Sequence, residues 1–100
     1  MMKDRKENPT DYLGCYRDDS NRHLQGLLYN MGERATLAKY RQLCHGYTYL
    51  GLQARTWCLC GNTLHKDGYP SVSEYECDMR CSGEPNRICG GGYRNSIYTV

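Results

Sequence analysis

Seven cysteines within 100 residues constrain this chain more than any other feature. Small chains that are dense in cysteine are usually cross-linked, and disulfides persist in oxidising compartments. Only 39% of the residues are hydrophobic and none is Phe, so a core that relies on ten tyrosines is marginal without cross-links. An odd count leaves one thiol over, and spacing alone allows about 105 arrangements of three bridges. We therefore expect one small, disulfide-stabilised domain.

Two of the cysteines lie two positions apart in the segment 57–62, Trp-Cys-Leu-Cys-Gly-Asn. Alternate residues of an extended strand point to the same face, so Cys58 and Cys60 face one layer and their apolar neighbours face the other. Upstream, Tyr40 and Cys44 are four residues apart and share one face of a helix. The spacing predicts a helix that lies over this strand and brings the four side chains together.

The rest of the chain indicates short strands around that single helix. The helix is expected to begin after Thr36, a favourable N-cap, and to end at Gly46. Strands are expected over residues 12–16, 24–29, 47–53, 55–60 and 95–100, with only turns in the remaining segments. The first and last strands are expected to pair, and alternation places Tyr12 and Tyr16 on one face of the first.

Charge and hydropathy exclude several classes of partner. The net charge is only +2 with both signs mixed, so we expect neither nucleic-acid binding nor membrane insertion by this segment. Residues 1–10 are charged and are expected to form a disordered N-terminal arm, without the apolar stretch of a secretory signal. Because the cysteines favour export, we expect a fragment or module of a larger protein whose signal lies elsewhere. The alternative is a cytosolic protein with reduced or metal-bound cysteines.

Other chemical uses of the cysteines are open at this point. A zinc site would draw on Cys44, Cys58, Cys60 and either Cys77 or His45. Structural zinc ligands are usually separated by two to four residues, whereas Cys58 and Cys60 are separated by one, so we expect no metal and no cofactor. A catalytic thiol would be Cys58 with His45 or His65 as its base, which we also do not expect. The run 18–21 lacks the ligand periodicity of a calcium loop.

A series of short motifs follows in order along the chain. They are Tyr12-Leu13-Gly14-Cys15-Tyr16-Arg17-Asp18, Leu24-x-Gly26, Thr36 with the helix to Cys44, Tyr49-x-Gly51-Leu52-Gln53, Trp57-Cys58-x-Cys60-Gly61-Asn62, Cys77-x3-Cys81-Ser82-Gly83, Ile88-Cys89-Gly90-Gly91 and Arg94-x3-Tyr98. This series resembles the WSC domain family, and the resemblance covers residues 11–100.

The resemblance implies a fold and a pairing of the cysteines. The implied fold is α+β: a small disulfide-rich module with one main helix packed on an antiparallel sheet, similar to PAN/apple domains. The implied disulfides are Cys15–Cys77, Cys44–Cys60 and Cys81–Cys89. Members of the family have an eighth cysteine, which bonds the equivalent of Cys58, and this chain has Tyr40 in its place. We therefore expect Cys58 to carry a free thiol that is open to intermolecular cross-linking.

The resemblance also implies a function, namely carbohydrate binding by a non-catalytic module that is extracellular or at the cell surface. Sugar sites need flat aromatic faces with a few placed polar groups. The candidate ligand-binding residues by type and position are Tyr16, Arg17, Asp18, Trp57, Asn62, Tyr69, Tyr93 and Arg94. Tyr69 and Tyr93 are the strongest candidates for exposed rings, because each lies in a glycine-containing turn. We expect the partner to be a cell-wall or matrix polysaccharide, which the module binds without catalysing a reaction on it. The alternative is a protein-interaction module of a secreted or receptor ectodomain without a sugar site.

Overall fold

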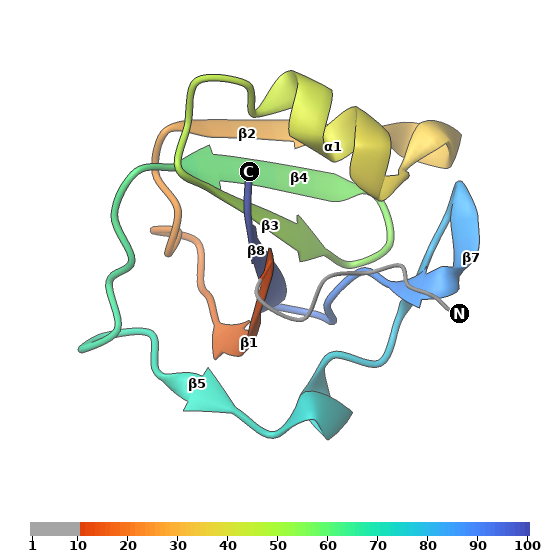
Figure 1. Ribbon diagram of the computed structural model, residues 1–100. Helices are drawn as coiled ribbons and strands as arrows, with labels where there is room; N and C mark the ends of the chain where they lie inside the picture. The colour runs from red at the N-terminus through yellow and green to blue at the C-terminus, as the bar shows by residue number, and fades with distance from the viewer. Residues whose placement is uncertain (1–10) are drawn as a thin grey trace.

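One helix and a six-stranded antiparallel sheet dominate residues 11–100, the part of the chain that the computed structural model describes (Figure 1). The elements are β1 (Tyr12–Arg17), β2 (Leu27–Asn30), the 3-10 turn η2 (Gly32–Arg34), α1 (Leu37–Leu43), β3 (Tyr49–Gln53), β4 (Trp57–Gly61), β5 (Ser71–Val72), the 3-10 turn η3 (Glu74–Glu76), β6 (Arg80–Cys81), β7 (Glu84–Ile88) and β8 (Arg94–Thr99). The sheet has the order β2-β4-β3-β8-β1-β5, and β6 and β7 form a separate hairpin. The predicted disordered arm, residues 1–10, lies outside the described residues.

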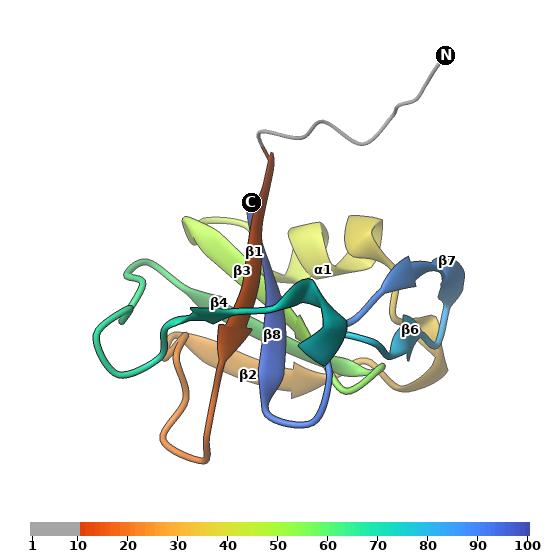
Figure 2. The ribbon, with the colours of Figure 1, turned by 90° about the horizontal axis from the view of Figure 1, so that it is seen from below.

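The five predicted strands are present, with bounds shifted by up to three residues. The first and last strands pair as expected: β1 and β8 are antiparallel neighbours, and they lie side by side in Figure 2. The short strands β5, β6 and β7 fall where the sequence indicates only turns. β5 pairs with the distant β1, and β5 and β6 have only two residues each, so local sequence patterns carry little sign of them.

The helix α1 forms where the sequence predicts it. The N–H of Lys39 donates to Thr36 Oγ1 at 3.2 Å, which satisfies one of the free donors of the first turn. Leu37 and Tyr40 are buried on the face that meets the sheet. Gly46 follows with φ +95, the left-handed conformation that commonly ends a helix. Figure 1 shows α1 lying over the end of the sheet that contains β2 and β4.

The sheet separates two hydrophobic cores. The helix-side core includes Leu37, Tyr40, Cys44, Leu50, Leu52, Cys58, Cys60, Cys81, Cys89 and Tyr98. The opposite core consists of Tyr16, Leu24, Leu59 and Ile97, with Trp57 packed against it. Alternation along β4 explains the division, because Cys58 and Cys60 face the helix while Leu59 faces away. The predicted contact between helix and strand is therefore present.

The first strand contradicts the expectation that Tyr12 and Tyr16 share a face. Its register with β8 shifts between Tyr12 and Gly14, and Gly14 has φ +136. Tyr12 therefore packs against the helix-side core, with its ring 4.9 Å from that of Tyr98, while Tyr16 lies in the opposite core. Simple alternation is wrong here because a bulge adds one residue to the strand and inverts the pattern beyond it.

Gly51 lies at a close approach in the middle of the sheet. Glycine inside a strand indicates either a bulge or a close contact, and the register of β3 with both neighbouring strands runs without a shift. A Cβ atom at Gly51 would lie 3.2 Å from both Asn95 Cγ and Leu24 Cδ1. The glycine therefore leaves room for these two side chains on the face opposite the helix.

Three disulfides join segments that are distant in the sequence. They are Cys15–Cys77, Cys44–Cys60 and Cys81–Cys89, with sequence separations of 62, 16 and 8 residues. These are the pairs that the family resemblance implies. The molecule is thus a small disulfide-rich α+β module, and its likeness to PAN/apple domains stays a prediction. Across residues 11–100, no helix is long and apolar enough to cross a membrane.

Candidate functional site

The buried carboxylate of Asp18 holds the loop that follows β1. Asp18 Oδ1 accepts a hydrogen bond from His23 N–H at 2.6 Å. Asp18 Oδ2 accepts from Gln53 Nε2 at 2.7 Å and from Arg22 Nη1 at 3.2 Å. A buried charge is stable when it is paired and hydrogen-bonded, and these three donors meet that need. Because both oxygens are engaged within the protein, Asp18 acts as an anchor for the loop and not as a calcium ligand.

An exposed aromatic ring lies beside this anchor. Tyr93 is 48% exposed and has φ +51. Arg22 Cζ lies 5.6 Å from the centroid of its ring, within the range of a cation–π contact. The carbonyl of Tyr93 accepts from Asp18 N–H at 3.0 Å, which fixes the turn against the loop. We call Tyr93, Arg22, Asp18 and Gln53 the Tyr93 surface.

A row of side chains crosses the sheet next to the Tyr93 surface. Tyr16 is paired with Asn95, Asn95 with Gln53, and Gln53 with Trp57. Directly opposed residues on antiparallel strands project to the same face, so all four lie on the face opposite the helix. Gln53 Nε2 donates to Asn95 Oδ1 at 2.8 Å, which fixes the two amides. The row places the half-buried Trp57 at its β4 end.

A second polar cluster holds the segment 62–69 against the same loop. The ring of His23 is buried and stacks on that of Tyr69 with 5.2 Å between centroids. Burial lowers the pKa of His23, and its Nε2 accepts from His65 N–H at 2.8 Å. The hydroxyl of Tyr69 donates to Asp19 Oδ1 at 2.6 Å. This bond raises the pKa of Tyr69 to about 12 and lowers the pKa of Asp19.

The structure brings five of the eight predicted ligand residues into this region. They are Tyr16, Asp18, Trp57, Tyr69 and Tyr93, which lie in the Tyr93 surface, in the adjoining row or in the His23 cluster. Tyr93 presents an exposed ring, whereas Tyr69 is partly buried against His23 and Tyr16 is core. Of the two rings selected from their glycine-containing turns, Tyr93 is thus the more accessible to a ligand.

The other three predicted residues have different surroundings. Asn62 Oδ1 accepts from Thr48 N–H at 2.9 Å and so helps to hold the turn before β3. Arg94 borders the Tyr93 surface, but its Nε donates to Glu76 Oε1 at 2.6 Å. Arg17 is exposed at the end of β1. None of the three belongs to the network around Asp18.

Sequence reasoning missed Arg22, His23, Gln53 and Asn95. Gln53 and Asn95 carried a usable signal, since each is a polar residue next to apolar strand residues, and two such positions can face each other. His23 and Arg22 carried none, because they lie in a polar loop whose path is set by Asp18.

The thiol of Cys58 is buried in the helix-side core. Its Sγ lies 3.6 Å from Cys44 Sγ, and burial raises the pKa of Cys58 to about 12. The group is therefore a neutral thiol at neutral pH, which is unsuitable for a nucleophile. Full burial also contradicts the expectation of intermolecular cross-linking, because another chain cannot reach the sulfur.

The three sulfurs at the helix–strand contact resemble a metal site only in their spacing. The Sγ atoms of Cys44, Cys58 and Cys60 lie within 4.8 Å of one another. Zinc binds cysteines as thiolates, whereas Cys44 and Cys60 are joined as a disulfide. The proposed fourth ligand Cys77 is bonded to Cys15. One thiol therefore remains, which does not make a metal site.

Tyr40 occupies the position where the family resemblance implies a cysteine, and it makes a different contact. Its hydroxyl lies 3.7 Å from Cys89 Sγ, and because Cys89 is oxidised the hydroxyl must be the donor. Burial raises the pKa of Tyr40 further above its ordinary value. The side chain thus connects α1 to the Cys81–Cys89 disulfide of the β6–β7 hairpin.

These features define a class of protein: a small disulfide-rich α+β module that carries an exposed aromatic ring beside a fixed polar network. The chain belongs to the WSC domain family, whose sequence model matches residues 12–91.

Similar sequences occur in proteins of very different size and name. A WSC domain-containing protein of Arthroderma benhamiae is 34% identical over 85% of this chain. Xylosyltransferase oxt of Drosophila pseudoobscura pseudoobscura is 36% identical over 86% of it, and glycerotoxin paralog 1 of Glycera tridactyla is 34% identical over 88%. The chain spans 12%, 10% and 7% of the lengths of these three relatives. The similarity therefore concerns one module within each of them.

Proposed function

We propose that the chain is a non-catalytic module that binds a cell-wall or matrix polysaccharide through the Tyr93 surface. The observation that carries this proposal is the half-exposed ring of Tyr93 beside the guanidinium of Arg22. An aromatic face contacts the C–H groups of a sugar ring, and a guanidinium donates to its hydroxyls. The network around Asp18 holds Arg22 in place, so the surface is preorganised for a ligand.

The setting of the module supports the same proposal. Three disulfides favour an extracellular or secreted location, where polysaccharides are available. One relative is named a xylosyltransferase, but the chain spans only 10% of it, and we do not assign its activity to this module. Binding through a single exposed ring is expected to be weak, and repeated modules or a multivalent ligand would raise the avidity.

Retention on insoluble polysaccharides tests the proposal. We expect the protein to co-sediment with at least one of glucan, chitin, xylan or cellulose, and Tyr93→Ala to lower the affinity about tenfold. Tyr75→Ala is the matched control, because Tyr75 is 92% exposed on η3 and lies outside the Tyr93 surface. Absence of retention on all four polysaccharides, or an unchanged affinity for Tyr93→Ala, would contradict it. The first of these outcomes would favour the alternative of a protein-interaction module.

A further inference from the structure

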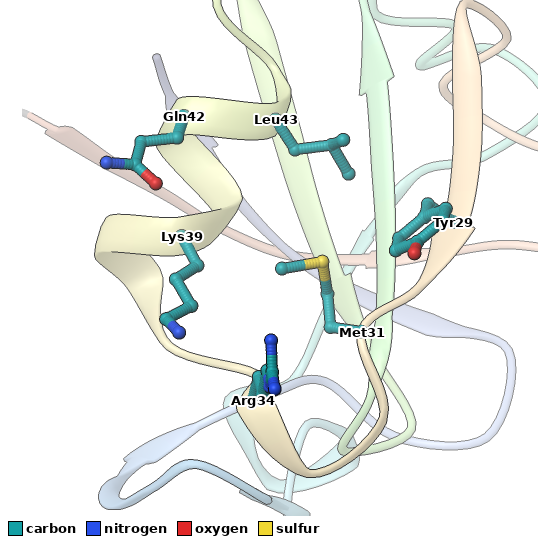
Figure 3. Close-up of a pocket in the computed structure, with 6 residues that line it drawn as sticks. All are labelled: Tyr29, Met31, Arg34, Lys39, Gln42 and Leu43. Carbon is teal, nitrogen blue, oxygen red and sulfur yellow. The ribbon is translucent and has the colours of Figure 1, made fainter.

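A groove lies on the other face of the sheet, between α1 and the edge strand β2. Figure 3 shows its lining: Tyr29 and Met31 from β2 and its end, Arg34 from η2, and Lys39, Gln42 and Leu43 from α1. The volume of the groove is about 440 Å³. Tyr29 is paired with Cys58 in the register of β2 and β4, so its ring projects to the helix side. The groove is therefore on the opposite side of the sheet from the Tyr93 surface.

The groove carries positive charge without a carboxylate. Arg34 and Lys39 line it, and no Asp or Glu is among its lining residues. In the part of the chain that the structure describes, neither cation forms an ion pair. Other cations do: Arg22, Arg41, Arg87 and Arg94 pair with Asp18, Asp11, Glu84 and Glu76. Two unpaired cations that point into one groove make an anionic ligand the complementary one.

The remaining lining residues indicate what kind of anion fits. Tyr29 is 53% exposed and offers a flat ring to the groove, and Figure 3 shows Met31 between it and the two cations. The amide of Gln42 is both a donor and an acceptor, as sugar hydroxyls require. An aromatic face, an amide and two cations together match a sugar ring that bears a carboxylate or a sulfate.

We propose that this groove binds an anionic saccharide, whose carboxylate or sulfate contacts Arg34 and Lys39 while its ring lies against Tyr29. The site is separate from the Tyr93 surface and adds a second class of ligand to the proposed function. Its volume lies near the lower end of the range for small-ligand sites, which fits one or two sugar rings. A protein partner needs about 800 Å² of contact on each side, more than six lining residues provide.

A second copy of the chain is a poor occupant of the same groove. Edge strands such as β2 can pair with one another, and its exposed Leu27, Leu28 and Tyr29 would favour this. Pairing of two β2 strands would, however, bring Arg34 and Lys39 of both copies to the same edge. Like charges at an interface are unfavourable, so charge argues for an acidic ligand over self-association.

The test is an NMR titration of the intact ¹⁵N-labelled chain with three probes. Oligogalacturonate supplies carboxylates, a heparin tetrasaccharide supplies sulfates as well, and a neutral laminarin oligosaccharide supplies neither. We expect at least one of the anionic probes to give saturable shifts at the amides of Tyr29, Arg34 and Leu43. Raising NaCl from about 50 to about 500 mM should weaken this binding, because salt screens exposed charges. Comparison of the two anionic probes identifies which anionic group the groove prefers.

The variant Arg34→Gln/Lys39→Gln is expected to lower the affinity about tenfold or more, and so is Tyr29→Ala. The control Arg55→Gln/Lys66→Gln removes the same net charge from exposed positions outside the groove and should leave the affinity within about twofold. An equal loss in the control would show non-specific attraction and overturn the proposal. So would the absence of binding by both anionic probes, or tighter binding of an oligoglutamate peptide than of either saccharide.

Failure of this proposal is distinguishable from failure of the proposed function. Retention on neutral polysaccharide is expected to depend on Tyr93 and to be unchanged in Arg34→Gln/Lys39→Gln. Loss of neutral retention in that double variant would mean that one site serves both ligands, and would overturn the assignment of a separate anionic site.

Discussion

At the scale of single residues, the reactivity of the Cys58 thiol measures whether reagents can enter the helix-side core. The structure pairs six of the seven cysteines and leaves this one buried with a pKa of about 12. We expect a thiol reagent to modify less than a tenth of the protein in the folded state and one thiol per chain after non-reducing denaturation. Rapid modification of the folded protein, or no thiol after denaturation of a monomer, would contradict the pairing.

Among the glycines after Cys89, Gly90 is at a close approach to other backbone atoms and Gly92 is not, and one substitution at each position tests this difference. Gly90 has φ +64, and a Cβ there would lie 2.3 Å from the carbonyl oxygens of Leu52 and Arg94. Gly92 has no atom within 4 Å of such a Cβ. Gly90→Ala should therefore lower the free energy of unfolding by about 2–4 kcal/mol, because neither carbonyl can move without breaking the sheet.

The matched control is Gly92→Ala, which should change the free energy of unfolding by less than about 0.5 kcal/mol. Urea denaturation monitored by tyrosine fluorescence measures both. If both substitutions lowered the free energy of unfolding by similar amounts, the turn as a whole, and not the close contact of Gly90 with the two carbonyl oxygens, would account for the sensitivity of this segment.

At the scale of elements, the contact between α1 and β4 has one disulfide, whereas the family resemblance implies two. Tyr40→Cys should restore the second by bonding Cys58, and all thiols should then be lost from the denatured, non-reduced protein. The new bridge would close a loop of 18 residues, from 40 to 58, which is worth about 3 kcal/mol in the chain-entropy model. Loss of the tyrosine ring opposes this by a similar amount.

The comparison that isolates the bridge is Tyr40→Ser, which removes the ring without adding a sulfur. We expect Tyr40→Cys to be more stable than Tyr40→Ser by about 3 kcal/mol in urea denaturation. Equal stability of the two, with one or more thiols still free in Tyr40→Cys, would mean that position 40 does not lie where a bond to Cys58 is possible.

The loop between β1 and β2 is expected to respond to pH through His23. Burial lowers its pKa, so the folded state binds a proton less readily than the unfolded chain, whose histidines titrate near 6.5. Stability is therefore full above about pH 6.5 and falls as the pH decreases toward the lower folded value. Urea denaturation at several pH values between about 7.5 and 5 measures the slope. Asp19 and Glu84, whose pKa values are lowered, contribute in a separate, more acidic window.

The variant His23→Asn should remove most of the change in the free energy of unfolding between about pH 7.5 and 5. The variant His45→Asn, at an exposed position after α1, should retain it. A titration of the imidazole ¹⁵N signals provides a direct check, because His23 should titrate below the ordinary histidine value. An unshifted His23 titration, or an equal slope in both variants, would contradict the burial argument.

The elements also differ in how far local sequence determines them. The helix was predictable because its cap Thr36, its buried stripe and its stop Gly46 all lie within eleven residues of each other. The Tyr93 surface was only partly predictable, because its members come from the loop after β1, from β3 and from the turn before β8, and their proximity depends on strand register. A single bulge at Gly14 was enough to invert the predicted face of Tyr12.

At the scale of the whole molecule, the disulfide with the longest loop should matter most. Cys15–Cys77 spans 62 residues and Cys81–Cys89 spans 8. In the chain-entropy model these are worth about 4 and about 2.5 kcal/mol, so Cys15→Ser/Cys77→Ser should be the less stable double variant. Differential scanning calorimetry of this variant and of Cys81→Ser/Cys89→Ser measures which of the two is less stable. The reverse order would mean that packing around Tyr40 and Cys89 outweighs loop closure.

The same scale shows why the fold class was more accessible than the ligand. Cysteine spacing and motif order are what identify the family, and the family resemblance implies the α+β fold and the disulfides. The groove beside Tyr29 and Arg34 depends on exposed side chains of an edge strand and a helix, and no motif marks them. Exposed residues vary freely where packing does not decide them, so patterns that reveal a core do not reveal a surface site.

The pairing of β1 with β8 has a consequence for how such a module is joined to other proteins. Tyr12 and Tyr98 are direct neighbours in antiparallel strands, so the start of β1 and the end of β8 lie at the same end of the sheet, about 5 Å apart. A host protein can receive the module within a surface loop without separating the two stems of that loop. Copies can also follow one another on short connectors. In each copy, Tyr93 would lie at the end of β8 that is remote from the attachment point, and β2 would form the outer edge of the sheet.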